Sequence, residues 1–178
     1  AYRLGELQNA RDLYEQSLAL FRRLGDDANA AHNRNDLGLI HKNLCEWDSA
    51  ILHLNAALEA FRGLGRYAET AIPLVNLGIV YQKSGELQRS IDHYREAERI
   101  FRQVANPLGV VRTTIGIGNV ARLQRRFSDA ERSFNEALES ARRQSARREE
   151  VLAIEFLGEL EFDRERPEAA IARYEEGQ

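Results

Sequence analysis

The chain has 178 residues, of which one is a cysteine, three are prolines and none is a methionine. A single cysteine, Cys45, excludes a disulfide framework, and an unpaired thiol is typical of a reducing compartment, so we expect a cytoplasmic protein. No apolar run approaches the roughly 18 residues that a membrane span requires, and the sequence predicts no membrane contact. Val, Ile and Thr are too sparse to favour an extensive β-sheet.

Neither sign of charge predominates, because the chain has 25 basic and 28 acidic residues and a net charge of only −3. Proteins that bind nucleic acid or anionic membranes without sequence preference are usually basic overall, so this balance argues against both classes. Only two of the basic residues are lysines, Lys42 and Lys83. Such an arginine bias is typical of GC-rich coding sequences and indicates a bacterial origin.

What the chain does contain is an internal repeat with a period of about 40 residues. It is marked by four glycines, twelve positions later by a small residue, and four positions after that by a large apolar one. The three series are Gly38, Gly78, Gly118 and Gly158; Ala50, Ser90, Ala130 and Ala170; Leu54, Tyr94, Phe134 and Tyr174. Spacings of 3, 4 and 7 within one unit indicate helices. The sequence predicts two per repeat, about Ala28–Leu44 and Trp47–Leu64 in one copy, with equivalents one and two repeats later.

The same repeat predicts how the helices end and pack. Second helices should stop at small residues, which are Gly25, Gly65, Ala105 and Ser145. Pro73 requires its helix to begin near Thr70 or to bend there. A glycine inside a helix is unfavourable by about 1 kcal/mol relative to alanine. Four glycines at one repeat position therefore predict helices that cross with no room for a side chain, with the Ala50 series facing the gap and the Leu54 series filling the space beside it.

The stretch Asn76-Leu77-Gly78 with Tyr81, Gly85, Ser90, Tyr94 and Ala97 resembles the tetratricopeptide repeat, in the 40-residue form of kinesin light chains, Pins-type adaptors and bacterial regulators. The resemblance implies an all-α fold, a right-handed superhelical solenoid of antiparallel helix pairs with about four and a half repeats. Departures include His41, Ala121 and Glu161 at the first-helix aromatic position, and Arg125 and Glu165 at the turn glycine.

On this basis we expect residues 1–178 to form a single array. It would hold a partial repeat at 1–25 and repeats at 26–65, 66–105, 106–145 and 146–178. Ala1–Leu4 should be the end of a first helix and Gly5 the turn after it. The first complete helix is too apolar for a free end, which favours a fragment of a longer array; its apolar residues are Leu7, Leu13, Leu18, Leu20, Phe21 and Leu24.

The resemblance further implies that first helices line a concave groove that binds a protein or peptide. Transferred residue by residue, the candidate partner-binding residues are Asn35, Asp36, Leu39, Lys42, Asn43, Asn76, Ile79, Lys83, Arg112, Asn119, Arg122, Phe156 and Glu159. In kinesin-light-chain-like members, asparagines of the groove clamp a peptide backbone, and Asn76 occupies the matching position. Lys83, Arg112 and Arg122 would pair with acidic groups of a ligand. Glu155, Glu159 and Asp163 would favour a basic segment.

Other functions compete with this scaffold role. The alternative is a ligand-sensing or self-association module of a bacterial transcription regulator or signalling protein, with a homo-oligomer as one form. Nucleic-acid binding through Arg142–Arg148 is disfavoured because Glu149 and Glu150 follow at once.

Catalysis and cofactor binding find little support. The motif Gly116–Ala121 spells G-x-G-x-x-A, but both glycines fall mid-helix in the repeat, where no pyrophosphate site forms. His53 and His93 hold the same position in adjacent repeats and could approach one another, but no cysteine joins them to make a zinc site. We therefore expect no enzyme, no metal and no cofactor.

Overall fold

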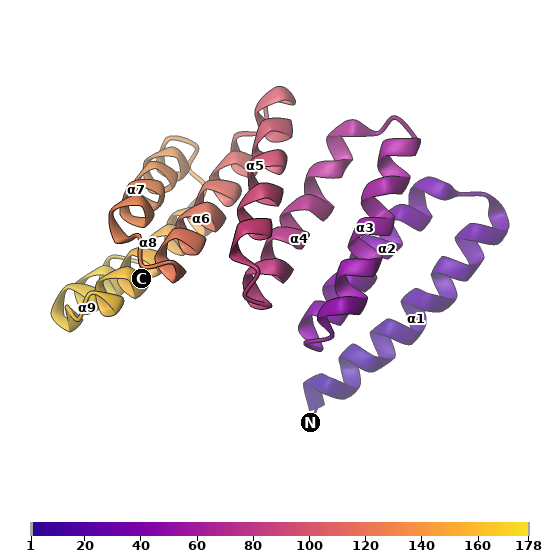
Figure 1. Cartoon of the computed structure of the whole chain (residues 1–178), viewed down its shortest axis with the longest axis horizontal. Coiled ribbons are helices and arrows are strands. Elements are labelled where there is room, and N and C mark those ends of the chain that lie inside the picture. The colour runs from indigo at the N-terminus through magenta and orange to yellow at the C-terminus, as the bar shows by residue number, and fades with distance from the viewer. Residues whose placement is uncertain (1, 178) are drawn as a thin grey trace. The chain divides into compact units, whose positions relative to one another are not determined.

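The computed structural model describes residues 2–177, with side chains from Gly5 onward, and all regular structure in this range is helical (Figure 1). The elements are α1 (Tyr2–Leu24), α2 (Asp27–Asn43), α3 (Trp47–Gly63), the 3-10 helix η1 (Tyr67–Thr70), α4 (Ala71–Lys83), α5 (Leu87–Gln103), α6 (Pro107–Leu123), α7 (Phe127–Arg143), α8 (Arg147–Asp163) and α9 (Pro167–Glu176). The predicted all-α class and the predicted pairing of helices are confirmed. Among the described helices, none combines the length and the apolar character needed to cross a bilayer.

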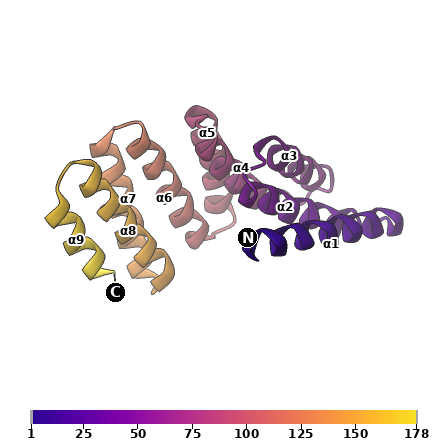
Figure 2. The same cartoon turned by 90° about the horizontal axis from the view of Figure 1, so that it is seen from below.

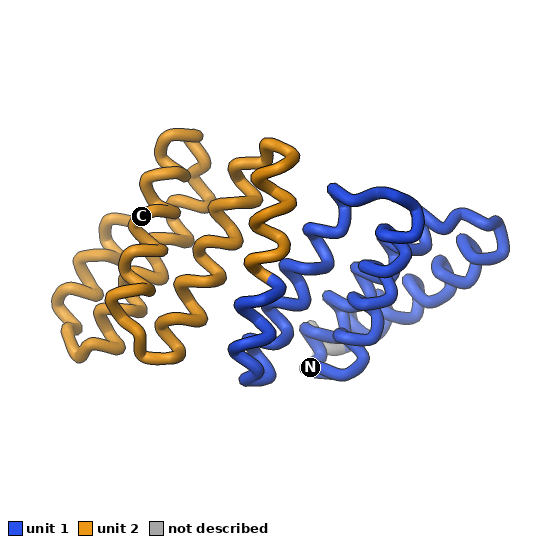
Figure 3. Tube along the Cα trace, turned by 45° about the horizontal axis from the view of Figure 1, so that its top comes forward, with its two compact units in different colours: residues 1–93 blue, residues 94–178 orange. Residues whose placement is uncertain are grey.

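The chain divides into two compact units, Ala1–His93 (unit 1) and Tyr94–Gln178 (unit 2), with the boundary inside α5 (Figure 3). In unit 1, α2 packs between α1 and α3, and α4 contacts both α2 and α3. In unit 2, α6 to α9 pack in chain order, and α6 also contacts α8 (Figure 2). Each unit therefore places two first helices side by side, α2 with α4 and α6 with α8. The single array over residues 1–178 stays a prediction.

Turns between the described helices recur twice in each repeat. Each contains one residue with φ in the left-handed region: Gly25, Cys45, Gly65, Gly85, Ala105, Arg125, Ser145 and Glu165. The next amide donates to the carbonyl five positions earlier, as from Glu86 N to Tyr81 O at 2.8 Å, which is the Schellman arrangement of a helix end. The four predicted ends of the second helices are confirmed. Arg125 and Glu165 adopt the same turn without glycine, in a conformation that is unfavourable for side-chain-bearing residues by about 1 kcal/mol or more.

The repeat glycines lie where two helices meet, as predicted. A Cβ atom at Gly38 would lie 2.6 Å from Leu54 Cγ, and one at Gly118 would lie 2.7 Å from Phe134 Cε1. Leu54 and Phe134 are fully buried, so neither has space to move away. At Gly38 the carbonyl of Ala50 also lies within 3.3 Å of the added atom, which places the small-residue series at this gap. Unit 1 and unit 2 thus pack their helix pairs in the same way, with a glycine of the first helix against a large buried side chain of the second.

The start of α4 also agrees with the sequence. Residues Tyr67–Thr70 form η1, and the Thr70 hydroxyl donates to Tyr67 O at 2.6 Å. The α-helix then begins at Ala71, so Pro73 lies in the first turn, where the missing amide proton is not needed.

The prediction for the first residues was wrong. Residues 2–24 form one continuous helix that includes Gly5, where a turn was expected, and Ala1 lies outside the described residues. Turn glycines such as Gly85 take φ of +86°, whereas Gly5 is helical, although no atom lies within 4 Å of the Cβ position of either glycine. At Gly5, continued helical hydrogen bonding outweighs the modest helix penalty of glycine.

Candidate functional site

Eight predicted binding residues lie on the neighbouring helices α2 and α4. We call them the unit 1 face: Asn35, Asp36, Leu39, Lys42, Asn43, Asn76, Ile79 and Lys83. Asn76 Nδ2 donates a hydrogen bond to Asn35 Oδ1 at 2.8 Å, and both side chains are buried. Asn35 Nδ2 in turn donates to Asp36 Oδ1 at 3.3 Å. The two amides therefore hold α2 against α4, which is a structural role that the sequence did not indicate. The side-chain oxygen of Asn76 is not used in this contact and can still accept a hydrogen bond.

Both lysines of the chain lie further along the same two helices. Lys42 follows Asn35, and Lys83 follows Asn76, by seven positions in each case, which is about two helical turns or 10.5 Å. Because α2 and α4 are alternate helices of an antiparallel series, they run in the same direction, and the two lysines fall on the same side of the contact. Burial lowers the pKa of Lys42, and the charge of Lys83 lowers it further. Within the described part of the chain, neither lysine has a carboxylate partner.

Aliphatic side chains lie between the amides and the lysines. Leu39 is one turn from both Asn35 and Lys42, and Ile79 holds the corresponding place on α4. Both are half-buried, so part of each remains open to a ligand. The unit 1 face thus presents amide, aliphatic and cationic groups in that order along two neighbouring helices.

The remaining predicted residues lie on α6 and α8. We call these, with the neighbouring Asp163, the unit 2 face: Arg112, Asn119, Arg122, Phe156, Glu159 and Asp163. Arg122 joins most of them, because its guanidinium lies 2.5 Å from Asp163 Oδ2 and 2.7 Å from Glu159 Oε2. Its Nε also donates to Asn119 Oδ1 at 3.1 Å. The sequence assigned these charges to separate ligand groups, whereas the structure pairs them with one another.

Two other members of the unit 2 face also have partners. Arg112 donates through Nε and Nη2 to Glu149 Oε1, at 2.9 and 2.7 Å. Glu149 is buried in the first turn of α8, where a carboxylate is also favoured by the helix dipole. Phe156 stacks on the core residue Phe134 with 5.4 Å between ring centroids, so one face of its ring belongs to the hydrophobic core. Sequence reasoning missed Glu149 as a partner, and only its place at a helix start could have indicated it.

The arginine cluster Arg142–Arg148 is largely neutralised within the protein. Arg142 pairs with Glu150 at 3.1 Å and with Glu176 at 2.7 Å. Arg147 pairs with Glu150, and Arg143 lies 3.8 Å from Glu139. These contacts weaken the case for phosphate binding there.

The histidines stack within their own helix pairs. His41 stacks on His53 with 5.1 Å between centroids, and Tyr81 stacks on His93 at 5.2 Å. His41 Nδ1 also lies 2.5 Å from Glu46 Oε2. His53 and His93 thus each pack on the first-helix aromatic position of their own repeat. No group of three or more metal-ligating side chains occurs among the described residues.

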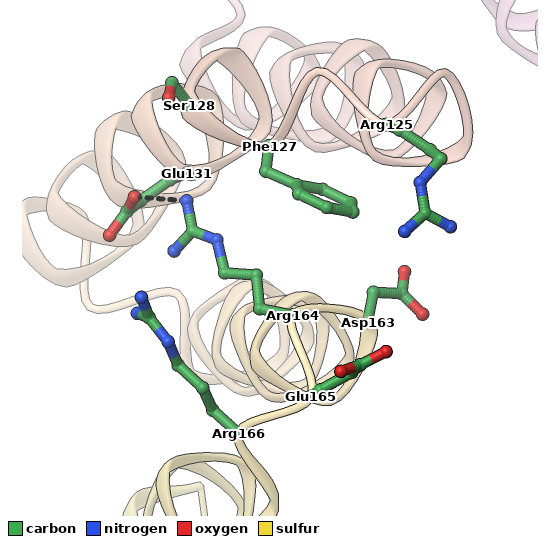
Figure 4. Close-up of a pocket in the computed structure, with 8 residues that line it drawn as sticks. All are labelled: Arg125, Phe127, Ser128, Glu131, Asp163, Arg164, Glu165 and Arg166. Atoms are coloured by element: carbon green, nitrogen blue, oxygen red, sulfur yellow. Dashed lines mark hydrogen bonds and ion pairs between the residues drawn. The ribbon is translucent and has the colours of Figure 1, made fainter.

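A polar pocket of about 610 Å³ lies in unit 2 between the α6–α7 turn and the α8–α9 turn (Figure 4). It is lined by Arg125, Phe127, Ser128, Glu131, Asp163, Arg164, Glu165 and Arg166. Arg164 donates to Glu131 Oε2 at 2.8 Å, which lowers the pKa of Glu131, and the Arg125 guanidinium lies over Phe127. The pocket was not predicted, because it forms where turns one full repeat apart in the sequence meet in space. Its three arginines are balanced by three carboxylates, so it offers no excess charge to a ligand.

Solved structures similar to this chain share its fold at low sequence identity. BtubC (BKLC) from P. vanneervenii superposes with a TM-score of 0.82 at 17% identity, over 99% of this chain and 73% of that one. Aspartyl phosphate phosphatase F from Bacillus subtilis gives 0.85 at 13%, over 99% of this chain and 47% of that one. A Rap protein complexed with competence and sporulation factor gives 0.85 at 13%, over 99% and 49%. The chain therefore spans about half the length of two of these proteins.

A search of curated protein sequences gives no match. The family model described as tetratricopeptide repeat matches residues 1–63, 44–103 and 69–143, which together make up most of the sequence. These matches, the helix pairs and the repeat glycines agree, and the chain belongs to the tetratricopeptide repeat family.

Proposed function

We propose that this protein is a non-catalytic scaffold that binds an extended segment of another protein along its first-helix faces, with the unit 1 face as the main contact. One observation carries the proposal. On α2 and α4, cations without a carboxylate partner among the described residues stand next to half-exposed aliphatic side chains, whereas the polar groups at the corresponding positions of unit 2 are already satisfied by one another.

The dimensions of the unit 1 face suit an extended chain. The distance of about 10.5 Å from the amide pair to the lysine pair equals about three residues of extended backbone at roughly 3.3 Å each. Asn76 Oδ1 would accept a hydrogen bond from a ligand amide, and Leu39 and Ile79 would cover an apolar side chain. A contact of this kind gains affinity from a few well-placed groups and not from area.

The comparisons support ligand binding in general terms. The family is built of helix pairs that serve mainly as protein-binding surfaces, and one structural neighbour is a Rap protein in complex with competence and sporulation factor. Because the identity to that neighbour is 13%, its ligand is not transferred to this chain.

A second candidate function is a self-association or sensing module within a bacterial regulator. One observation favours it: Leu13, Leu20 and Leu24 lie on one side of α1 and are 65%, 52% and 70% exposed. An exposed stripe of leucines on a helix is typical of a surface that packs against another helix. Sedimentation velocity over a hundredfold concentration range tests it. A concentration-dependent dimer that Leu20→Glu abolishes would favour this candidate.

The scaffold function is tested by selecting binders from a random dodecapeptide display library on the immobilised protein. The selected peptides are then measured by fluorescence anisotropy against two matched variants. Leu39→Asp changes the unit 1 face, and Leu52→Asp makes the same change at a 69% exposed position on α3. We expect Leu39→Asp to weaken binding at least tenfold and Leu52→Asp to leave it unchanged. Failure to select any peptide, or equal effects of the two variants, would contradict the proposed function.

A further inference from the structure

We propose that a pocket between α1, α2 and α3 of unit 1 binds a small aliphatic carboxylate. The pocket has a volume of about 340 Å³, which falls within the range of roughly 300–1,000 Å³ for small-molecule sites. Two guanidinium groups, of Arg22 and Arg34, and the carboxylate of Asp27 line it. The rest of the lining is a small aliphatic surface made of Ala30, Ala31, Ala60, Gly63 and Leu64. The inference goes beyond the peptide-binding function and does not depend on it, because none of these residues belongs to the unit 1 face.

Arg34 is the exception at its position in the repeat. One, two and three repeats later the same position holds Leu74, Thr114 and Ile154, and all three side chains are buried. Arg34 is only half-buried, and its Nη1 donates to Ala56 O of α3 at 3.3 Å, so the side chain lies on the side of α2 that packs against α3. A charged group where the other repeats place a buried side chain breaks the packing rule of the repeat, and such exceptions are typical of functional sites.

The two arginines of the pocket have no ion-pair partner. Within the part of the chain that the structure describes, neither Arg22 nor Arg34 forms an ion pair with a carboxylate. Burial lowers the pKa of Arg34, the charge of Arg22 lowers it further, and Asp27 offsets only part of this. Because an arginine side chain does not lose its proton in proteins, the unfavourable free energy of its charged form remains until an anion compensates it. An anion in the pocket would attract both guanidinium groups.

The equivalent pocket of unit 2 shows how the same space is closed. It lies between α5, α6 and α7 and has a volume of only about 150 Å³. Its lining includes Val110 and Val111, which stand two repeats after Ala30 and Ala31. Larger side chains at two equivalent positions therefore take up space that unit 1 leaves open.

The charges of the unit 2 pocket are also satisfied within the protein. Arg102 lies 2.9 Å from Glu98, and Arg143 lies 3.8 Å from Glu139. Glu136 adds a further carboxylate to the lining. Unit 1 thus differs from unit 2 in two independent ways that both favour a ligand, a larger space and unpaired cations.

The lining indicates the chemical class of the ligand. Two arginines and one aspartate give a net charge of +1, which a monoanion would neutralise, and Asp27 would repel a dianion such as phosphate. The planar guanidinium group matches the geometry of a carboxylate with two parallel hydrogen bonds. Alanine, glycine and leucine offer no side-chain hydrogen bonds, and their surface favours an aliphatic tail. The expected ligand is therefore a monocarboxylate with a short aliphatic chain, as in a free acid or at the C-terminus of a peptide.

Hexanoate is the probe, and saturation-transfer difference NMR on the full chain measures its binding. We expect a dissociation constant of about 1 mM, which is reasonable for a ligand of this size. Hexanamide, which keeps the tail without the charge, and acetate, which keeps the charge without the tail, should each bind at least tenfold more weakly. N-acetyl-leucine carries the terminal carboxylate of a peptide beside an aliphatic side chain, so comparing its affinity with that of hexanoate distinguishes the two sources of ligand.

A pair of matched double variants tests the arginines. Arg22→Gln/Arg34→Gln should weaken hexanoate binding at least tenfold. Arg102→Gln/Arg143→Gln makes the same charge change at the equivalent pocket of unit 2 and should leave hexanoate binding unchanged. Circular dichroism of both variants checks that the helices are intact.

A second pair of variants tests the pocket itself while both arginines remain. Gly63 lines the pocket and has no atom within 4 Å of its Cβ position, so Gly63→Leu should fill the space without a clash and abolish hexanoate binding. Gly5→Leu is the matched control, because Gly5 is also helical, has the same free space around its Cβ position and does not line the pocket.

Three results would overturn the inference. One is equal hexanoate affinity in the unchanged protein and in either Arg22→Gln/Arg34→Gln or Gly63→Leu. Another is hexanamide binding as tightly as hexanoate, and the third is inorganic phosphate binding more tightly than hexanoate. Peptides selected by display should bind Gly63→Leu as well as they bind the unchanged protein, so a failure of this site and a failure of the proposed function are observed separately.

Discussion

Unit 1 and unit 2 are built on the same repeat but present different chemistry at equivalent positions. Lys42 and Lys83 of unit 1 correspond to Arg122 and Asp163 of unit 2, and Ile79 corresponds to Glu159. In unit 2 these positions form an ion-pair network around an arginine whose side chain is 14% exposed. In unit 1 they form a cationic and aliphatic surface without such a network among the described residues.

The difference teaches that the repeat fixes which positions meet and leaves their chemistry free. The same sequence offset, 41, joins Asn35 to Asn76 by a hydrogen bond and Arg122 to Asp163 by an ion pair. Opposite charges at this offset attract each other and stabilise unit 2. Like charges at this offset repel each other in unit 1 and remain open to a ligand. One face is thus an internal support and the other a candidate binding surface.

The largest expected effect tests what the two units share. Gly38→Val in unit 1 and Gly118→Val in unit 2 should each lower the free energy of unfolding by about 3 kcal/mol, because each side chain would overlap a fully buried Leu54 or Phe134. Urea unfolding followed by circular dichroism measures both. Gly63→Val is the matched control, since no atom lies within 4 Å of its Cβ position. An equally large loss at Gly63 would show that helix propensity and not packing explains the repeat glycines.

The second test gives unit 2 the charge pattern of unit 1. Asp163→Lys places a cation beside Arg122 and should destabilise the protein by about 1–2 kcal/mol, because a partly buried guanidinium loses a partner and gains a like charge. Glu175→Lys, an equal charge change at an exposed position of α9, should change stability little. Equal effects of the two substitutions in urea unfolding would mean that the Arg122–Asp163 contact contributes nothing specific.

The reciprocal exchange should act in the opposite direction and more weakly. Lys83→Asp gives α2 and α4 an opposite-charge pair and should raise the free energy of unfolding by about 0.5–1 kcal/mol. The same change should weaken binding of peptides selected on the unit 1 face, because Lys42 then has an internal partner. Arg95→Asp, on the exposed side of α5, controls for net charge. A lower melting temperature for Lys83→Asp, or unchanged peptide affinity, would contradict the comparison of the two faces.

Much of the fold was predictable because glycine and other small residues are favoured at particular backbone positions, namely helix ends and close helix crossings. The repeat period predicted helices within about one position of Asp27–Asn43 and Trp47–Gly63, and it predicted that second helices end near Gly65 and Ala105. Gly5 misled the prediction, because glycine is compatible with a helix as well as with a turn.

The candidate site was less predictable, because pairing depends on how two helices are placed against each other. The sequence placed Arg122 and Glu159 on first helices of successive repeats, but it could not show that they pair with each other. It also missed the partnership of Arg112 with Glu149, which are far apart in the sequence and follow no local pattern. The pocket beside Asp163 likewise appears only once the turns are placed in space.

Turn residues offer a smaller contrast between the units. Gly85 of unit 1 and Arg125 of unit 2 occupy equivalent positions in the turns of successive repeats, with φ of +86° and +59°. Arg125→Gly should therefore stabilise the protein, and Gly85→Ala should destabilise it, each by about 0.5–1 kcal/mol. Thermal unfolding of the two variants measures the pair. If Arg125→Gly were destabilising, the contact of its guanidinium with Phe127 would outweigh the backbone strain.

The smallest effect concerns pH, since all four histidines lie in unit 1. Burial lowers the pKa of His53, and the neighbouring His41 and Arg34 lower it further. Because the unfolded chain then binds more protons than the folded one, the stability of unit 1 should be complete above the ordinary histidine pKa of about 6.5 and should fall as the pH drops below it. Hydrogen exchange at pH 7.5 and pH 5.5, corrected for intrinsic rates, should show protection of α3 falling more than that of α7. His53→Gln should remove part of this difference, because the glutamine does not titrate. Equal loss of protection in α3 and α7, or an unchanged difference in His53→Gln, would show that carboxylates common to both units, and not His53, govern the response to acid.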